Sequence, residues 1–168
     1  MDLLAGRATI EDLDDFVARI GAIGDEHGAI VQAFDPRYVV DRDHLERAVA
    51  LADRAIERDE AIADDRAMEI LCYAAGTRQI REALTIGVSR GESVPVLVLI
   101  DGGDESGARE GIEPLLDETG EGSGGSVGDY DEGAVRAFFE ISDAELAATD
   151  AGIPALVRER VALLVVER

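Results

Sequence analysis

The sequence predicts an α/β protein of the α+β class, a single compact domain with a small mixed or antiparallel sheet flanked by about six helices. Three observations predict this fold. The length of 168 residues suits one ordinary domain. Hydrophobic residues make up 46% of the chain, which is enough for a packed core. Strand-like and helix-like apolar patterns alternate irregularly, whereas a doubly wound sheet needs regular alternation. We expect the domain to cover residues 1–168.

The first half of the chain carries two strand patterns and four helix patterns. The apolar spacing predicts strands at 3–9 and 29–34, and helices at 12–23, 41–56, 65–75 and 77–84. Pro36 marks the turn after the second strand, because its ring holds the preceding residue in an extended conformation. Gly76 is placed to end the third helix, since glycine adopts the left-handed conformation without a side-chain clash. Thr77 then caps the fourth helix, whose apolar positions are Ile80, Ala83 and Leu84.

The second half begins with the clearest buried strand, at 94–100. A helical turn or two is expected at 108–116, and the acidic, glycine-rich segment 118–133 is expected to be a mobile loop. The run AVRAFFEI at 134–141 predicts a strand with Phe138 and Phe139 on opposite faces. Ser142 and Glu145 have capping-box spacing and open a helix at 143–149. Pro154 opens the last element, a helix that continues to Leu164 or finishes as a strand.

The charge of the chain is unusual for a packed protein. Thirty-seven acidic residues face 16 basic ones, all of them arginine, so the formal net charge is −21. In molar salt the Debye length falls to about 3 Å, and surface carboxylates then hardly repel one another. A hydrated acidic surface also keeps a halophilic protein soluble. We therefore expect a cytoplasmic protein of a salt-accumulating organism, in which acidity does not exclude a nucleic-acid partner.

The sequence lacks a recognisable constellation for catalysis, metal binding or membrane insertion. Cys72 is the one cysteine and lies in an apolar stretch, which is typical of a core residue. His27 and His44 lack the spacing of metal ligands, so we expect them to be surface or capping residues. The apolar runs are shorter than the ~20 residues that span a bilayer, and no signal peptide is recognised. We expect no catalytic residue, no metal, no cofactor and no membrane contact.

The joint at 74–79 is the segment whose residues are best suited to bind a ligand. One predicted helix ends at Gly76 and the next begins at Thr77, so unpaired backbone N–H groups and a positive dipole end are expected there. Arg78 and Gln79 add a guanidinium and an amide, a combination that can hold a phosphate or a carboxylate. The alternative is a tight helix–helix corner in which small residues permit close packing and Arg78 pairs with Glu82.

The run MEILCYAAGTRQI at 68–80 resembles the signature of the small subunit of the KEOPS complex, the archaeal type of the PRPK-binding-protein family. Three further stretches agree with that family, at 32–35, 44–48 and 141–164. The resemblance implies a compact α/β domain without enzymatic activity. It implies two partners, the small atypical kinase of the complex and tRNA, which is bound through its single-stranded 3′ CCA end. The complex installs threonylcarbamoyl-adenosine beside the anticodon, with the chemistry performed by another subunit.

The two partners are assigned to two sites. We expect the RNA site at the joint, with Gly76, Thr77, Arg78 and Gln79. We expect the kinase site on the last helices, where apolar residues occur on more than one helix face and predict an exposed patch. Its residues are Leu146, Ile153, Leu156 and Val157. A small-molecule-binding regulatory domain, which needs an apolar pocket, and a stand-alone hydrolase, which needs a polar cleft, remain as alternatives.

Overall fold

The computed structural model describes residues 1–119 and 126–166. It has the α+β fold that the sequence predicts, with an antiparallel sheet. The chain forms two compact units, each built from two segments. Unit 1 consists of Met1–Pro36 and Gly87–Val127, and unit 2 of Arg37–Ile86 and Gly128–Arg168. That the whole chain acts as one domain stays a prediction.

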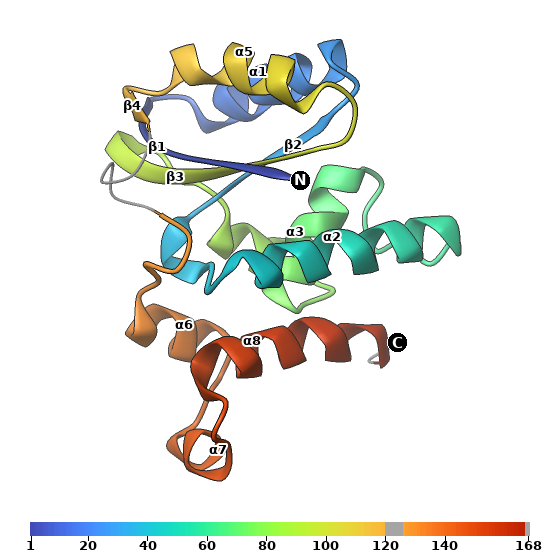
Figure 1. Cartoon of the computed structure of the whole chain (residues 1–168), viewed down its shortest axis with the longest axis vertical. Coiled ribbons are helices and arrows are strands. Elements are labelled where there is room, and N and C mark those ends of the chain that lie inside the picture. The colour runs from blue at the N-terminus through green and yellow to red at the C-terminus, as the bar shows by residue number, and fades with distance from the viewer. Residues whose placement is uncertain (120–125, 167–168) are drawn as a thin grey trace. The chain divides into compact units, whose positions relative to one another are not determined.

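Unit 1 contains the sheet and two helices (Figure 1). Its elements are β1 (Asp2–Ile10), α1 (Leu13–Glu26), β2 (Ile30–Phe34), β3 (Gly91–Asp101), α5 (Glu105–Ile112), the 3-10 turn η3 (Glu113–Leu115) and β4 (Glu118–Thr119). The strand order is β2-β3-β1-β4, and each neighbouring pair is antiparallel. The helices α1 and α5 lie side by side over one face of this sheet, as Figure 1 shows.

The core of unit 1 follows the two-residue period of its strands. Leu4 of β1 and Ala33 of β2 both pair with Val98 of β3, so the three side chains share one row. Phe16 and Ile20, four residues apart on α1, pack against that row. Asp12 begins α1 by accepting a hydrogen bond from the backbone of Asp15 at 3.1 Å. The predicted strand and helix patterns here are therefore confirmed.

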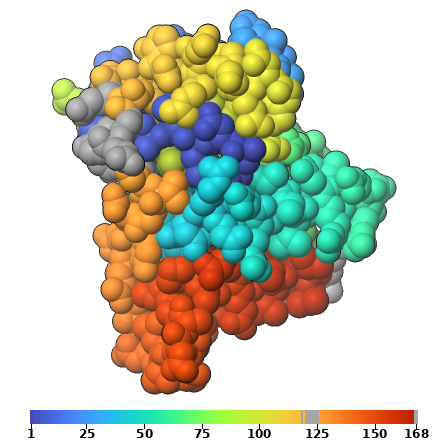
Figure 2. Space-filling model, in the orientation of Figure 1, coloured from blue at the N-terminus to red at the C-terminus, as the bar shows by residue number. Residues whose placement is uncertain are grey.

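Unit 2 is helical. Its elements are η1 (Pro36–Tyr38, which begins at the last residue of unit 1), α2 (Arg42–Glu57), α3 (Arg66–Ala75), α4 (Ile80–Ala83), η2 (Leu84–Ile86), α6 (Glu132–Phe138), α7 (Asp143–Ala148), α8 (Gly152–Leu163) and η4 (Leu164–Val166). Figure 2 shows the red atoms of α8 against the cyan atoms of α2, and the two helices are in contact. Asp41, Asp65 and Ser142 each cap a helix by accepting a backbone N–H three residues ahead.

The segment 134–141 corrects a prediction, because AVRAFFEI is not a strand. Asp131 caps helix α6 through the backbone N–H of Ala134. Val135 and Phe139, four residues apart, are both buried in the core of unit 2. Phe138 and Phe139 lie in edge-to-face contact at 4.9 Å, instead of facing opposite sides of a sheet. A short apolar run with a period-four pair was read as a period-two pattern.

The expected mobile loop at 118–133 is only partly an irregular segment. Its first two residues form β4, where Thr119 pairs with Gly6, and its last two belong to α6. The remainder includes residues 120–125, which lie outside the described residues. The last element is helical to Leu163 and then a 3-10 turn, so its expected alternative as a strand is wrong. In the described part of the chain, none of the helices has the length and apolarity that crossing a bilayer requires.

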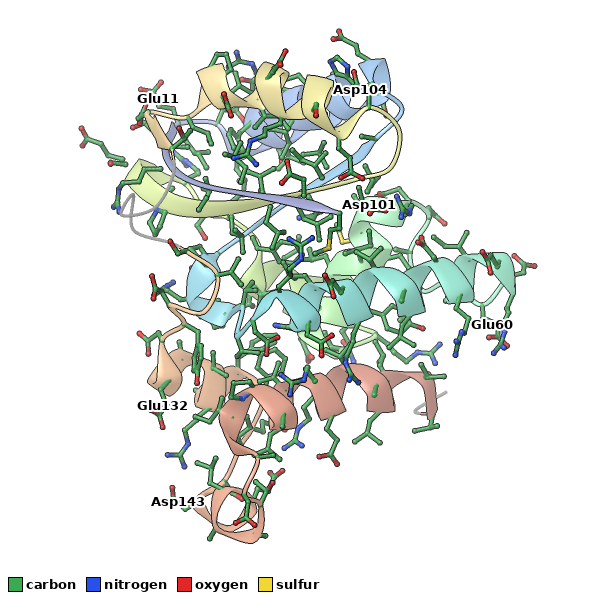
Figure 3. The ribbon with its side chains drawn as sticks, viewed as in Figure 1. Glu11, Glu60, Asp101, Asp104, Glu132 and Asp143 are labelled. Atoms are coloured by element: carbon green, nitrogen blue, oxygen red, sulfur yellow. The ribbon has the colours of Figure 1, made fainter. Side chains whose placement is uncertain are left out.

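Most of the acidic residues of the described chain lie at least partly on the surface, and Glu69 is a buried exception. Glu60, Glu132 and Asp143 point away from the ribbon in Figure 3, and all three are exposed. Several arginines pair with acidic residues four positions away on the same helix, such as Arg42 with Glu46 at 2.8 Å. Exposed pairs of this kind contribute little stability.

Candidate functional site

The corner at Gly76 is fixed by its backbone. Gly76 has a φ of 65°, the left-handed region, and the N–H groups of Gly76 and Thr77 donate to the carbonyls of Tyr73 and Cys72 at 3.0 and 3.2 Å. A side chain at position 76 would also lie 3.3 Å from the Arg160 carbonyl of α8. Both the turn and the close approach of α8 therefore require glycine, as the corner alternative in the sequence predicts.

Thr77 does not cap the next helix. The N-cap of α4 is Gln79, and Thr77 instead accepts a hydrogen bond from the Gln79 backbone at 3.1 Å. The Thr77 hydroxyl donates to Glu82 at 3.0 Å. Because α4 is a single turn, its dipole is small, so the helix end contributes less to an anion site than the sequence suggests.

Arg78 and Arg81 supply the positive charge of the corner. Both side chains are exposed, and neither forms a hydrogen bond or an ion pair within the described residues. The expected pairing of Arg78 with Glu82 does not form, since Glu82 accepts from Thr77. In a chain with a net charge of −21, two unpaired guanidinium groups three residues apart on a surface are available to an anionic partner.

His44 anchors the helix that leads into this corner. It is fully buried, so the expectation of a surface or capping histidine is wrong. Its Nδ1 accepts from the Val40 backbone at 3.3 Å, and its Nε2 therefore carries the proton and donates to the Ala74 carbonyl at 2.7 Å. Burial away from water holds the pKa of His44 below its ordinary value, although the Ala74 hydrogen bond acts in the opposite direction. A neutral imidazole thus links α2 to the end of α3.

A hollow of about 630 Å³ opens beside the corner. The residues that line it are Ala75, Gly76, Thr77, Glu82 and Thr85 on the α3–η2 segment, Ala137, Phe138, Phe139 and Glu140 at the end of α6, and Arg160 of α8. The hollow therefore joins two of the predicted RNA-site residues, Gly76 and Thr77, to a wall more than fifty residues away in the sequence.

Arg160 holds the second wall in place. Its Nε donates to the Phe139 carbonyl at 3.1 Å and its Nη2 to the Glu140 carbonyl at 3.3 Å. The same Nη2 donates to both carboxylate oxygens of Glu145, at 2.7 and 2.8 Å, which lowers the pKa of Glu145. One guanidinium thus ties the end of α6 and the first turn of α7 to α8.

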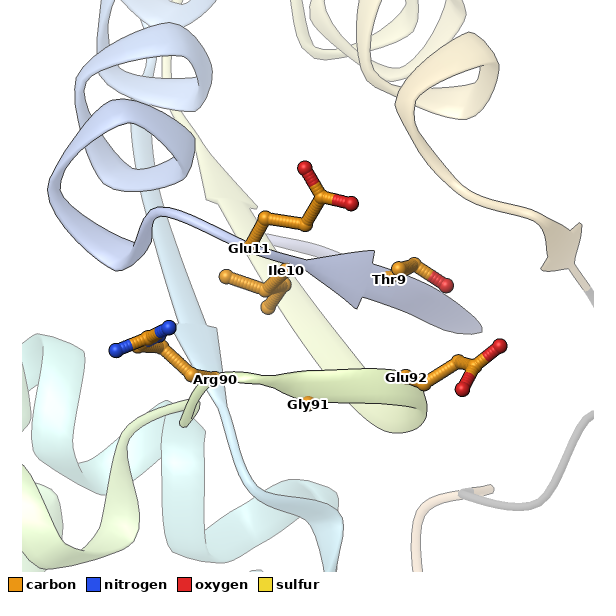
Figure 4. Close-up of a pocket in the computed structure, with 6 residues that line it drawn as sticks. All are labelled: Thr9, Ile10, Glu11, Arg90, Gly91 and Glu92. Carbon is orange, nitrogen blue, oxygen red and sulfur yellow. The ribbon is translucent and has the colours of Figure 1, made fainter.

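Another hollow lies in unit 1, between the end of β1 and the start of β3 (Figure 4). Its labelled side chains diverge: Arg90, Glu11 and Glu92 point in three different directions. The hollow is built from adjacent strand ends and brings no polar groups together on a common centre. For this reason we treat the hollow beside Gly76 as the candidate site.

The residues expected to bind the kinase are mostly core residues. Ile153 and Leu156 are each 7% exposed and Val157 is fully buried, and Leu146 packs against the same cluster. The expectation of an exposed apolar patch at these positions is therefore wrong. The large apolar side chains that α8 and η4 do expose are Leu163 and Val166, at 40% and 73%.

Cys72 and the acidic groups complete the survey of reactive side chains. Burial raises the pKa of the Cys72 thiol to about 11, so the thiol stays protonated at neutral pH. Within residues 1–119 and 126–166, no three histidine, cysteine or carboxylate side chains converge as metal ligands.

The comparison with protein families decides the identity. The model of the family described as "Kinase binding protein CGI-121" matches residues 19–164, which include the corner, the hollow and the last helices. The chain belongs to the CGI-121 family. No curated protein matches the sequence at a significant level. The family match confirms the resemblance to the KEOPS small-subunit family.

Sequence reasoning missed several residues of the site in this CGI-121 family member. Phe138, Glu140 and Arg160 were assigned to other elements, and no local pattern connects them with Gly76. Glu69, inside the family motif, was also overlooked. It is a buried carboxylate that accepts from the backbone N–H groups of Ile62 and Ala63 at 2.7–3.0 Å. A glutamate in an otherwise apolar helix stripe was the one available signal for such a structural role.

Proposed function

We propose that this chain is a non-catalytic subunit of the KEOPS complex, which binds the complex's small kinase and recruits tRNA through its 3′ CCA end for threonylcarbamoyl-adenosine modification. The observation that carries the proposal is the match to a kinase-binding family over residues 19–164. The unpaired arginines at the family motif support the RNA part, because an acidic protein that binds RNA must keep some cations free of its own carboxylates.

The kinase docks on the outer side of α8 and η4 in this proposal. Leu163 and Val166 supply the exposed apolar contact, while Ile153, Leu156 and Val157 hold the helix in place from the core. Co-purification with the kinase from lysate in molar KCl tests the assignment. Leu163→Arg and Val166→Arg are expected to lose the kinase, and Val17→Arg, at an apolar position of unit 1 that is 50% exposed, is expected to retain it. If Leu163→Arg and Val166→Arg both still co-purify with the kinase, the kinase binds elsewhere on the chain.

The RNA contact is at Gly76, Thr77, Arg78 and Gln79 in this proposal. Arg78 meets a phosphate or stacks on a base, Gln79 contacts a base edge, and Gly76 and Thr77 set the corner that positions them. Charge-assisted contacts contribute about 1.5–3 kcal/mol, so Arg78→Ala is expected to weaken tRNA binding by about tenfold or more.

The binding experiment uses intact tRNA and tRNA that lacks its CCA end. Arg78→Ala is expected to weaken binding of the intact molecule and to change little for the truncated one. Arg19→Ala, which removes an exposed arginine in unit 1, is the matched control. Equal affinity of Arg78→Ala and parent for intact tRNA would remove this corner from the RNA site.

A further inference from the structure

The aromatic side chains that are not fully buried gather in one part of unit 2. Aromatic residues make up only 4% of the chain, as four phenylalanines, three tyrosines and no tryptophan. Four of these seven side chains are buried in the core. The other three are half-buried, and all belong to unit 2: Tyr38, Tyr130 and Phe138. In a chain this poor in aromatic residues, rings that stay at the surface mark a candidate partner contact, because tyrosine is enriched where partners bind.

Two contacts hold these rings in one place. The Asp131 backbone N–H donates to the Arg37 carbonyl at 2.9 Å, which brings the backbone of Tyr130 next to that of Tyr38. Tyr38 contacts Phe138 edge-to-face, with the ring centres 5.7 Å apart. Figure 1 shows the orange segment that leads into α6 passing the light-blue turn η1. A partner that packs on these rings therefore immobilises few side chains that were free before.

The groups beside the rings favour a cation. Asp129, Asp131 and Glu132 are exposed and flank Tyr130 in the sequence, whereas Arg37 is the exposed cation beside Tyr38. The guanidinium carbon of Arg37 lies 5.6 Å from the centre of the Tyr38 ring, so the chain already places one arginine on a ring of this cluster. The surplus of carboxylates repels a phosphate and attracts a second guanidinium.

We propose that Arg37, Tyr38, Asp129, Tyr130 and Glu132 (the tyrosine surface) dock a protein segment that presents an exposed arginine. The guanidinium of the partner packs on the Tyr130 ring and pairs with Asp129 or Glu132, in the way that Arg37 packs on Tyr38. The inference goes beyond the proposed function and does not depend on it, because the tyrosine surface includes none of the residues assigned to the RNA or to the kinase.

Molar salt makes such a surface selective for arginine over lysine. The Debye length falls to about 3 Å, so attraction between exposed charges contributes little affinity. A lysine ammonium is strongly hydrated and gains little without that attraction, whereas a guanidinium is weakly hydrated and packs flat on an aromatic ring. For a guanidinium on an exposed ring we expect a preference of about fivefold.

The test titrates the full chain in molar KCl with a short peptide of alternating glycine and arginine, and in parallel with the lysine counterpart. Because the chain has no tryptophan and Tyr73 is buried, a change of intrinsic fluorescence reports on Tyr38 and Tyr130. The wild type is expected to bind the arginine peptide about fivefold more tightly. Tyr38→Ala and Tyr130→Ala are each expected to remove that preference, and the tyrosine that remains on the surface still reports binding.

Two control variants accompany these titrations. Tyr130→Phe keeps an aromatic ring and is expected to retain the arginine preference. Glu159→Gln changes an exposed carboxylate of α8 outside the tyrosine surface and is expected to behave as the wild type. If Tyr38→Ala does not fold, because it loses the contact with Phe138, the comparison of Tyr130→Ala with Tyr130→Phe decides alone.

Loss of the arginine preference in Tyr130→Ala, with retention in Tyr130→Phe, supports the proposal. Equal binding of the two peptides by the wild type, binding of neither peptide, or an arginine preference that Tyr130→Ala retains overturns it. A third titration uses oligouridine. If the oligonucleotide changes the fluorescence of the surface tyrosines and the arginine peptide does not, the tyrosine surface takes RNA and the proposal is wrong.

Discussion

Helices α4 and α8 both belong to unit 2 and both carry large apolar side chains, but α4 exposes most of them and α8 buries most of them. The α4–η2 segment, whose apolar positions the sequence places at Ile80, Ala83 and Leu84, exposes Ile80 at 41% and Leu84 at 52%. Helix α8 buries Ile153, Leu156 and Val157, which were expected to form an exposed patch. The difference is one of neighbours. Helix α8 packs on α2 and α3, and its apolar residues join those of α6, so apolar residues on several faces find partners. Helix α4 is one turn long and buries only Ala83.

The comparison shows that an apolar stripe on a helix predicts a contact, but does not tell whether the contact is with the protein's own core or with a partner molecule. The same sequence feature marks a core helix when several elements surround it, and a partner surface when only one does. Four expected outcomes test this contrast, in order of decreasing effect.

The largest difference is expected between two leucines. Leu156→Ala should lower the free energy of unfolding by about 2–5 kcal/mol, because it removes a core side chain. Leu84→Ala should change it by less than about 0.5 kcal/mol, because the leucine is half exposed. Urea unfolding in molar KCl measures both. Equal losses would mean that α4 is packed as tightly as α8.

Gly76 ends α3 at the point where α8 approaches it, and its replacement is expected to have an intermediate effect on stability. Gly76→Ala should lower the free energy of unfolding by about 1–2 kcal/mol. The left-handed conformation is unfavourable for alanine, and the new Cβ would lie 3.3 Å from the Arg160 carbonyl of α8. Gly21→Ala, inside α1 with no atom within 4 Å of the new Cβ, should instead stabilise by about 0.5–1 kcal/mol. Melting temperatures that shift in the same direction for both variants would contradict the conformational role of Gly76.

The anchor His44 makes the corner sensitive to acid. Its folded-state pKa is lowered, so the unfolded chain binds the proton more readily, and stability is fully present above the ordinary pKa of about 6.5 and is lost as the pH falls below it. Between about pH 7.5 and about pH 5.5 the wild type should lose more stability than His44→Gln, which has no imidazole to protonate. Asp41 and Arg158 stand near the ring and act in opposite directions. Identical pH slopes for the two proteins would show that the pKa of His44 is the same in the folded and the unfolded chain.

The smallest effect on stability is expected at Arg78. Because the side chain is exposed and forms no ion pair within the described residues, Arg78→Ala should change the free energy of unfolding by less than about 0.5 kcal/mol. The proposed RNA role predicts a loss of affinity without a loss of stability. Calorimetry measures the stability and a tRNA titration measures the affinity. A large loss of stability in Arg78→Ala would mean that Arg78 has a structural role.

The local signals in the sequence predicted much of the fold. Asp65, Gly76 and Ser142 end or begin helices as expected, and β1, β2 and β3 lie where their apolar runs are. The element α6, which the sequence predicts as a strand, is short and contains adjacent phenylalanines, which fit either period. Gly76 and Thr77 of the predicted RNA site do line a hollow, whereas the chemistry of the opposite wall was not foreseen.

The sequence by itself determined the caps at Asp65 and Ser142, the turn at Gly76, the acidic composition and the family. Each of these depends on residue types within a few positions or on the chain as a whole, and the energies involved are local. Only the tertiary structure decided that His44 is buried against Ala74, that α8 is enclosed, and that Phe138 and Glu140 stand opposite Gly76. These outcomes depend on contacts between residues thirty or more positions apart, for which the periodicity of a single element carries no information.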